Sequence, residues 1–162
     1  EAISMHATGV DAIDGFSLRG QGLEPLVIQD VSLALEGGVP STLRWTAPAE
    51  PSPTMMHLVL SIANHGGTPG QIDCEVADTG EFTFPLALTD ALLALGYSGF
   101  PAVWLTRRTA TSVDNELGCI QFVVQSNAGL DITIPGLTSC SDDTDCPDGQ
   151  TCGPDLACSE TN

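Results

Sequence analysis

The sequence predicts an all-β protein, an antiparallel β-sandwich of the immunoglobulin or jelly-roll type with one short helix, followed by a small disulfide-stapled C-terminal module. Three observations lead to this prediction. Short apolar segments recur through the first 137 residues, and several alternate apolar and polar side chains with a period of two. Clusters of Gly, Pro, Asn and Asp separate these segments, as turns separate strands. Four of the six cysteines fall in the last 23 residues, a segment too short to bury a useful core.

The strands are expected where the apolar segments lie. In residues 31–35 the larger apolar side chains share one face. In the next clear example, one face is formed by Ile120, Phe122 and Val124. Strands at this spacing are typical of a sandwich or a barrel. The expected strands span residues 2–8, 26–35, 42–45, 57–64, 71–76, 81–84, 102–107, 118–125 and 130–134.

One segment departs from the strand pattern. Residues 89–96 begin with the cap candidates Thr89 and Asp90, continue with good helix formers and stop at Gly96. They predict one or two helical turns that cross between the sheets.

The length of the chain, 162 residues, suits one ordinary core and falls short of two. We place a boundary near Pro135-Gly136-Leu137, which divides the chain into a β-sandwich domain of residues 1–137 and a cysteine-rich tail of residues 138–162.

The charge of the chain is strongly negative. It has 21 acidic residues and four basic ones, all Arg, for a net charge of −17. Such a surface repels nucleic acid and anionic membranes, so we exclude both as partners. No segment approaches the ~20 apolar residues of a membrane span. Because the chain begins at Glu1 without Met, we expect a mature form or an excised fragment from which any export signal or lipid anchor has been removed.

The six cysteines indicate an oxidising compartment, and hence a secreted or cell-surface protein. They are Cys74, Cys119, Cys140, Cys146, Cys152 and Cys158. Six cysteines allow 15 pairings, but their clustering favours a Cys74–Cys119 bond in the main domain and two bonds within the tail. The alternative is a zinc site with four cysteine ligands. Such sites usually bring their ligands as close pairs, and this tail places five residues between successive cysteines.

Asp78-Thr79-Gly80 matches the D-T-G signature of aspartic proteases. Those enzymes need two such carboxylates that share a proton, and this chain has a single copy of the motif. We therefore interpret the motif as a hairpin turn between two strands. Nucleophile elbows, P-loops and zinc-protease motifs do not occur in the sequence.

The tail aspartates are candidates for calcium binding. They are Asp142, Asp143, Asp145 and Asp148. Closely spaced carboxylates can coordinate Ca²⁺, but their register differs by one residue from that of an EF-hand loop. The alternative is that these side chains shape turns by accepting backbone hydrogen bonds.

Copper is a further candidate, because His6 follows Met5, and His57 follows Met55 and Met56. His65 is the third histidine of the chain. No local chelate spacing occurs among these residues, and the alternative is that they fill the core.

The two tryptophans, Trp45 and Trp104, are candidate platforms for a sugar, although packing in the sandwich core is the expected role of both.

Two segments carry a resemblance to known families. The tail, with Asp145-Cys146-Pro147-x-Gly149-x-x-Cys152, resembles the Dickkopf-like cysteine-rich modules of secreted proteins, notably those of myxobacteria. The resemblance implies the bonds Cys140–Cys152 and Cys146–Cys158, and no activity. The segment Ile72-Asp73-Cys74-Glu75-Val76 through Pro85, followed by a Leu-rich turn and Leu105-Thr106-Arg107, is similar to a β-sandwich domain of myxobacterial secreted proteins and lipoproteins with no assigned function.

These observations favour a non-catalytic extracellular or cell-surface protein that acts in binding or structural assembly, with a protein or a glycan as partner. The alternatives are a metal-binding protein, for calcium or copper, and an extracellular hydrolase that uses scattered acids. In the assembly variant, residues 2–8 add a strand to the sheet edge of a neighbouring copy and build a homo-oligomer or filament.

Overall fold

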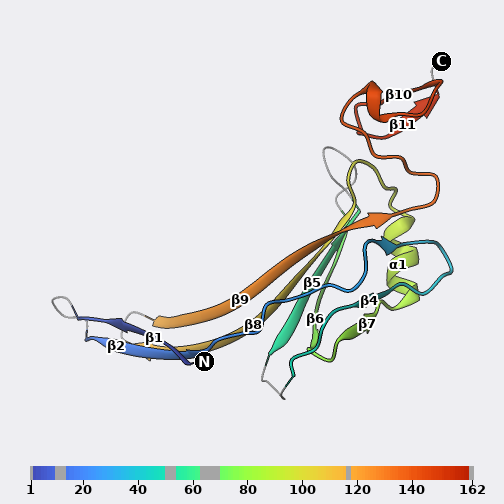
Figure 1. Cartoon of the computed structure of the whole chain (residues 1–162). Helices are drawn as coiled ribbons and strands as arrows, with labels where there is room; N and C mark the ends of the chain where they lie inside the picture. Colours follow the sequence, from blue (N-terminus) through green and yellow to red (C-terminus); the bar gives the residue numbers. More distant parts are fainter. Residues whose placement is uncertain (1, 10–13, 50–53, 63–69, 116–117, 161–162) are drawn as a thin grey trace.

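The computed structural model describes residues 2–9, 14–49, 54–62, 70–115 and 118–160. It confirms an all-β protein with one short helix, α1 (Leu86–Leu93), and a C-terminal disulfide-linked module (Figure 1).

A five-stranded sheet forms the frame of the main domain. In sheet order its strands are β3 (Leu33–Ala34), β9 (Gly118–Thr133), β8 (Ala102–Asn115), β5 (Met55–Ser61) and β6 (Gln71–Ala77). The pairs from β9 to β6 are antiparallel, and the short edge strand β3 runs parallel to β9.

The second layer is smaller than a full sandwich sheet. It consists of the antiparallel pair β4 (Thr42–Arg44) and β7 (Glu81–Thr83), with α1 beside it (Figure 1). This layer covers one face of the five-stranded sheet, because the side chains of that face form the core. The opposite face carries the exposed residues of the same strands.

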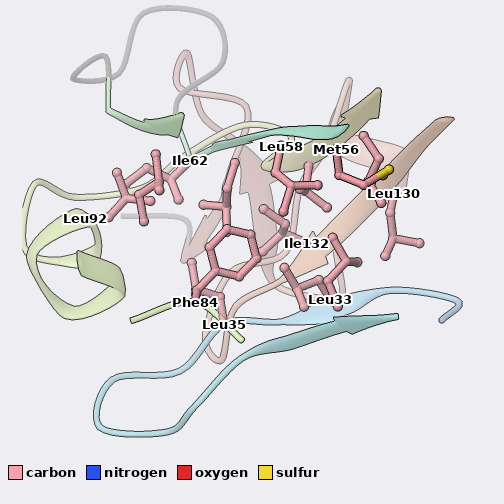
Figure 2. Close-up of a cluster of buried hydrophobic side chains, with 14 of the residues drawn as sticks. Leu33, Leu35, Met56, Leu58, Ile62, Phe84, Leu92, Leu130 and Ile132 are labelled. Carbon is pink, nitrogen blue, oxygen red and sulfur yellow. The ribbon is translucent and has the colours of Figure 1, made fainter. Parts of the chain in front are cut away.

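The core follows from strand alternation. Along β5, Met56, Leu58 and Leu60 are fully buried, while the intervening residues point to the other face. Full burial of one such side chain stabilises the fold by about 1.5–3 kcal/mol. Figure 2 shows this cluster. Strands contribute Leu33, Leu130 and Ile132, the helix contributes Leu92, and Leu35 and Phe84 directly follow β3 and β7.

The β8–β9 hairpin is much longer than the sequence predicts. Pairing with β5 stops at Arg108, so residues 109–115 and 118–124 extend beyond the sheet (Figure 1). A second hairpin, β1 (Ala2–Ala7) with β2 (Phe16–Gln21), packs along this extension. We call the extension and the second hairpin the β-arm.

Gly20 allows the two hairpins of the β-arm to approach closely. A Cβ at this position would lie 2.9 Å from Cγ2 of Val124 and 3.0 Å from Cε1 of Phe122. The sequence pattern missed β2 altogether, because its Ser, Arg and Gly residues hide the single buried side chain of the strand, Leu18.

The sequence pattern predicts two strands where the structure has β9 alone, with a break at residues 126–129. The Ser-Asn-Ala-Gly run at this point has no large apolar side chain, yet it pairs with β8 without interruption. The last residue of the run, Gly129, lies beneath the side chain of Trp104, as described below.

The prediction that Asp78-Thr79-Gly80 closes a hairpin is wrong. β6 pairs with β5, whereas β7 pairs with β4 in the other layer. The motif is therefore a turn that carries the chain from one layer to the next. Gly80 has a positive φ of 97°, and its carbonyl accepts a hydrogen bond from the backbone N–H of Trp45.

The helix begins three residues before the predicted start at Thr89. Pro85 precedes its first turn, where the missing N–H of proline costs nothing, and Thr89 lies inside the helix with its side chain fully buried. The hydroxyl of Thr89 donates to the carbonyl of Leu86, which replaces the expected capping role. The predicted stop at Gly96 agrees with its φ of 89°, two residues after the C-cap Ala94.

The tail contains a 3₁₀ turn, η1 (Asp143–Asp145), and the antiparallel pair β10 (Gln150–Cys152) and β11 (Cys158–Glu160). Its bonds are Cys140–Cys152 and Cys146–Cys158, which is the pairing that the resemblance implies. Ser139 ties the tail to the main domain, because its hydroxyl donates to the carbonyl of Gly99.

Candidate functional site

The candidate site is the face of the five-stranded sheet that the second layer leaves uncovered, which we call the open sheet face. It is formed by outward side chains of β5, β6, β8 and β9. The most exposed large apolar side chain of these strands is Trp104 on β8, which is 58% exposed. In the sheet, Trp104 lies between Val59 on β5 and Gly129 on β9.

The indole ring of Trp104 lies flat over Gly129. A Cβ built on Gly129 would lie 2.7, 2.9 and 3.2 Å from three consecutive ring carbons, Cζ3, Cε3 and Cη2. An atom at the edge of the ring would be clearly closer to one carbon than to its two neighbours. The nearly equal distances therefore place the Gly129 position beneath a ring face, and the opposite ring face is turned to solvent.

Two polar pairs hold the neighbouring side chains in place. Nε2 of His57 lies 2.8 Å from a carboxylate oxygen of Asp73, and Nη2 of Arg108 donates to Glu75 over 2.9 Å. Both pairs are partly exposed, so each contributes little to stability. The first pair joins β5 to β6 and the second joins β8 to β6, so both engage charges on the open sheet face.

Beyond Trp104, the open sheet face continues along β9 and onto the β-arm as a row of uncharged polar side chains. The successive outward positions of this part of β9 are Gln121, Val123, Gln125 and Asn127. We call the three amide side chains the amide row. Opposite Asn127 on β8 lies Thr106, and opposite Gln121 lies Ser112. In a chain with 21 acidic residues, this long uncharged row is unusual.

Comparison of the chain with models of protein families, with curated proteins and with solved structures finds no match.

The expectation that both tryptophans pack in the core is right for Trp45 alone. Trp45 is 1% exposed, whereas Trp104 is outside the core on the open sheet face. One feature of the sequence distinguishes the exposed Trp104 from the buried Trp45, namely the run of small residues that ends at Gly129, the partner of Trp104 on β9.

Asp78, the acid of the D-T-G motif, is part of a buried ion pair. Its side chain is 2% exposed, and that of Arg107 is 1% exposed. Nε and Nη2 of Arg107 donate to the two carboxylate oxygens over 2.6 and 3.1 Å. Trp45 Nε1 and Thr54 Oγ1 each donate to a further lone pair over 2.8 Å. Four donors thus occupy both oxygens, and neither oxygen is left to activate a water molecule.

Burial alone would raise the pKa of Asp78, but the hydrogen bonds from Arg107, Trp45 and Thr54 and the charge of Arg107 outweigh it and hold the pKa below its ordinary value. The carboxyl is therefore ionised at neutral pH. An aspartic protease dyad requires the opposite, a shared proton between two acids.

The predicted Cys74–Cys119 bond is wrong, and both thiols are free. Cys74 is on β6 and points into the core side, while Cys119 is exposed near the end of the β8–β9 hairpin. Across the sheet, Cys74 is in register with Leu58, Leu105 and Ala128. Cys119 lies nine positions farther along β9 than Ala128, or about 30 Å.

Three of the four tail aspartates accept hydrogen bonds from other groups of the tail, and the fourth, Asp148, is exposed. Asp142 accepts from the N–H and hydroxyl of Thr144, Asp143 accepts from the N–H of Cys152, and Asp145 accepts from the N–H of Ser141. The Thr144 hydrogen bonds lower the pKa of Asp142. Among the described residues, the one group whose ligand atoms cluster closely enough for a metal ion is Cys140, Cys146 and Cys158, all of which are in disulfides.

The histidine and methionine candidates for copper are dispersed. Met56 is fully buried in the core, and His57 is bonded to Asp73 on the open sheet face. His6 is on the β-arm, where its Nδ1 lies 2.8 Å from Oγ of Ser17 on an exposed surface. His65 is outside the described residues.

The segment expected to pair with a neighbouring copy, residues 2–8, forms β1 and pairs with β2 of its own chain. In the described part of the chain, no helix has the length and apolar character that crossing a membrane requires.

Proposed function

We propose that this protein is a non-catalytic binding module of the cell surface or extracellular space, and that it binds its partner on the open sheet face. The observation that carries the proposal is the flat, exposed indole of Trp104, seated on Gly129 in a sheet face that no other described element covers. A large aromatic ring held rigidly on a sheet presents contact area without the entropy cost of ordering a flexible side chain.

The chemistry of the reactive groups supports a non-catalytic role. The buried carboxylate of Asp78 is saturated by four donors. The Ser17–His6 contact resembles a nucleophile with its base, but both residues are exposed on the β-arm. A catalytic pair of this kind requires a third group that orients the base and a site that excludes water.

The two tail disulfides support an oxidising compartment. Self-assembly through a sheet edge is part of the same proposal, and sedimentation at high concentration tests it.

The proposal is tested by retention of labelled protein on surface material of the producing cells. We expect the wild type to be retained, Trp104→Ala to be lost, and Tyr97→Ala to behave like the wild type. Tyr97 is the matched control, because it is an exposed aromatic residue just after α1, away from the open sheet face. Absence of retention contradicts the proposal, and loss with Tyr97→Ala would move the binding surface to the end of the helix.

The hydrolase alternative is tested on peptide and glycan substrate panels. Turnover that Ser17→Ala abolishes would replace the binding proposal by an enzymatic one.

A further inference from the structure

The open sheet face offers a ligand one flat aromatic ring beside a row of neutral hydrogen-bonding groups. The ring of Trp104 turns one face to solvent, and the amide row lies on the adjacent strand, beginning two residues from Gly129. From Gly129 to Gln121 the face spans eight residues of β9, or about 27 Å. The ligand that fits is extended, and it combines an apolar side with polar edges.

The hydrogen-bonding character of the amide row narrows the ligand class. A primary amide both donates and accepts, whereas a carboxylate only accepts and an ammonium only donates. Sugar hydroxyls also do both, so amides match them in any orientation. Pyranose rings supply the remaining feature, because one side of the ring carries C–H groups that can lie on an indole.

The charges argue for a neutral glycan. The one cation on the outward face of β8 between Trp104 and Ser112 is Arg108, and it is paired with Glu75. The net charge of −17 repels uronic-acid and sulfated chains. A protein partner would call for several apolar anchors around the tryptophan, and here the neighbours across the strands are Val59 and Gly129.

We propose that the open sheet face binds a neutral glycan, with the solvent-facing side of the Trp104 ring stacked on a sugar ring and with Gln121, Gln125 and Asn127 bonded to hydroxyls. This inference rests on the proposed binding function and names its ligand class. Gly129 acts as a positioning residue, because it contributes no contact to the sugar and sets the plane of the indole.

The test uses the whole protein and calorimetric titration with soluble neutral glucans, mannans, xylans, galactans and chitooligosaccharides. Polygalacturonate and heparin are the anionic members of the panel. We expect at least one neutral glycan to bind, the anionic glycans to give no heat, and Trp104→Ala to lower affinity by about tenfold or more.

Gly129→Ala is the sharper variant, since it keeps the tryptophan. A methyl group 2.7 Å from Cζ3 is closer than real contacts allow, so the ring must leave its plane. We expect affinity to fall with an accompanying shift in tryptophan emission, while far-ultraviolet circular dichroism stays unchanged. Gln125→Ala is expected to weaken binding to a smaller extent, and Tyr97→Ala is expected to leave it intact.

Three outcomes overturn the inference: no neutral glycan binds, anionic glycans bind equally well, or binding is indifferent to both Trp104→Ala and Gly129→Ala. Periodate and protease treatment of the cell-surface material separates this failure from failure of the proposed function. Periodate destroys vicinal diols, so glycan binding is lost with periodate. Retention that survives periodate and is lost with protease would leave a binding module whose partner is a protein.

Discussion

Substitution of Asp78 by Asn should destabilise the protein strongly, because it removes the negative charge and leaves the guanidinium of Arg107 buried without a counter-ion. Arg107 is 1% exposed, and its remaining partners are the backbone carbonyls of Glu24 and Thr46. Breaking one side of a buried ion pair costs about 3–5 kcal/mol. This is a large part of the ~5–15 kcal/mol that stabilises a typical domain.

The neighbouring arginine provides a matched control. Arg108 follows Arg107 on β8 but points to the open sheet face, where it pairs with a glutamate, Glu75, in partial contact with solvent. Glu75→Gln should therefore cost at most about 1 kcal/mol. Each variant removes the carboxylate charge that pairs with an arginine, and the two arginines are adjacent on β8. The two ion pairs differ in burial.

The assay is urea unfolding followed by far-ultraviolet circular dichroism. With an m-value of about 2 kcal/mol per M, a cost of about 4 kcal/mol lowers the midpoint by about 2 M, whereas the control shifts it by about 0.5 M or less. An Asp78→Asn cost below about 1 kcal/mol, or equal costs for the two variants, would refute the reasoning.

The free energy of unfolding that Asp78 contributes should depend on pH in a definite direction. The folded-state pKa of Asp78 is lowered, so its contribution to stability is fully present above the unfolded carboxyl pKa of about 3.9 and is lost as pH falls through the folded value. The stability difference between wild type and Asp78→Asn should be constant near neutral pH and should shrink in acid.

Three further predictions concern the cysteines and the β-arm. Denatured, unreduced protein should show two thiols per chain with a thiol reagent, and a count of zero would restore the Cys74–Cys119 bond. The folded protein should react quickly at Cys119 and slowly at Cys74, because burial and the nearby charge of Asp73 raise the pKa of the Cys74 thiol. The double variant Cys146→Ser, Cys158→Ser opens a loop of 12 residues and should destabilise the tail by about 3 kcal/mol. We expect proteolysis confined to the tail, and a large drop in the urea midpoint of the main domain would contradict this expectation. The added side chain of Gly20→Val should overpack against Val124 and Phe122 and raise the rate of hydrogen exchange in β1 and β2. Hydrogen exchange of β5 is the internal reference, and an unchanged rate in β1 would count against the packing described.

Strand periodicity was sufficient to predict most strands and the all-β class, because each of those strands has one face in the core and one in solvent. It failed where this asymmetry is weak. In β2 a single side chain, Leu18, is buried, so no apolar pattern marks the strand. The β-arm as a whole buries little, and its strands are fixed by pairing between segments far apart in the sequence.

The candidate site was predictable in part. The sequence identified Trp104 as one of two possible platforms, but its exposure depends on which face of β8 it occupies and on the absence of a side chain at Gly129, a pairing partner 25 residues away. The Cys74–Cys119 assignment failed for a similar reason, since counting cysteines does not reveal sheet register. The role of Asp78 required Arg107, with which it shares no local motif.

The groups around Arg107 also bear on how the chain folds. Its guanidinium binds a carboxylate 29 residues away and carbonyls 61 and 83 residues away in the sequence. Loops of this length must all close before the arginine loses its last water, so the complete set of bonds can form only late, when the strands are already assembled. Folding of this domain should be slow for its size, and a weakened Arg107 site should mainly accelerate unfolding and leave the folding rate nearly unchanged.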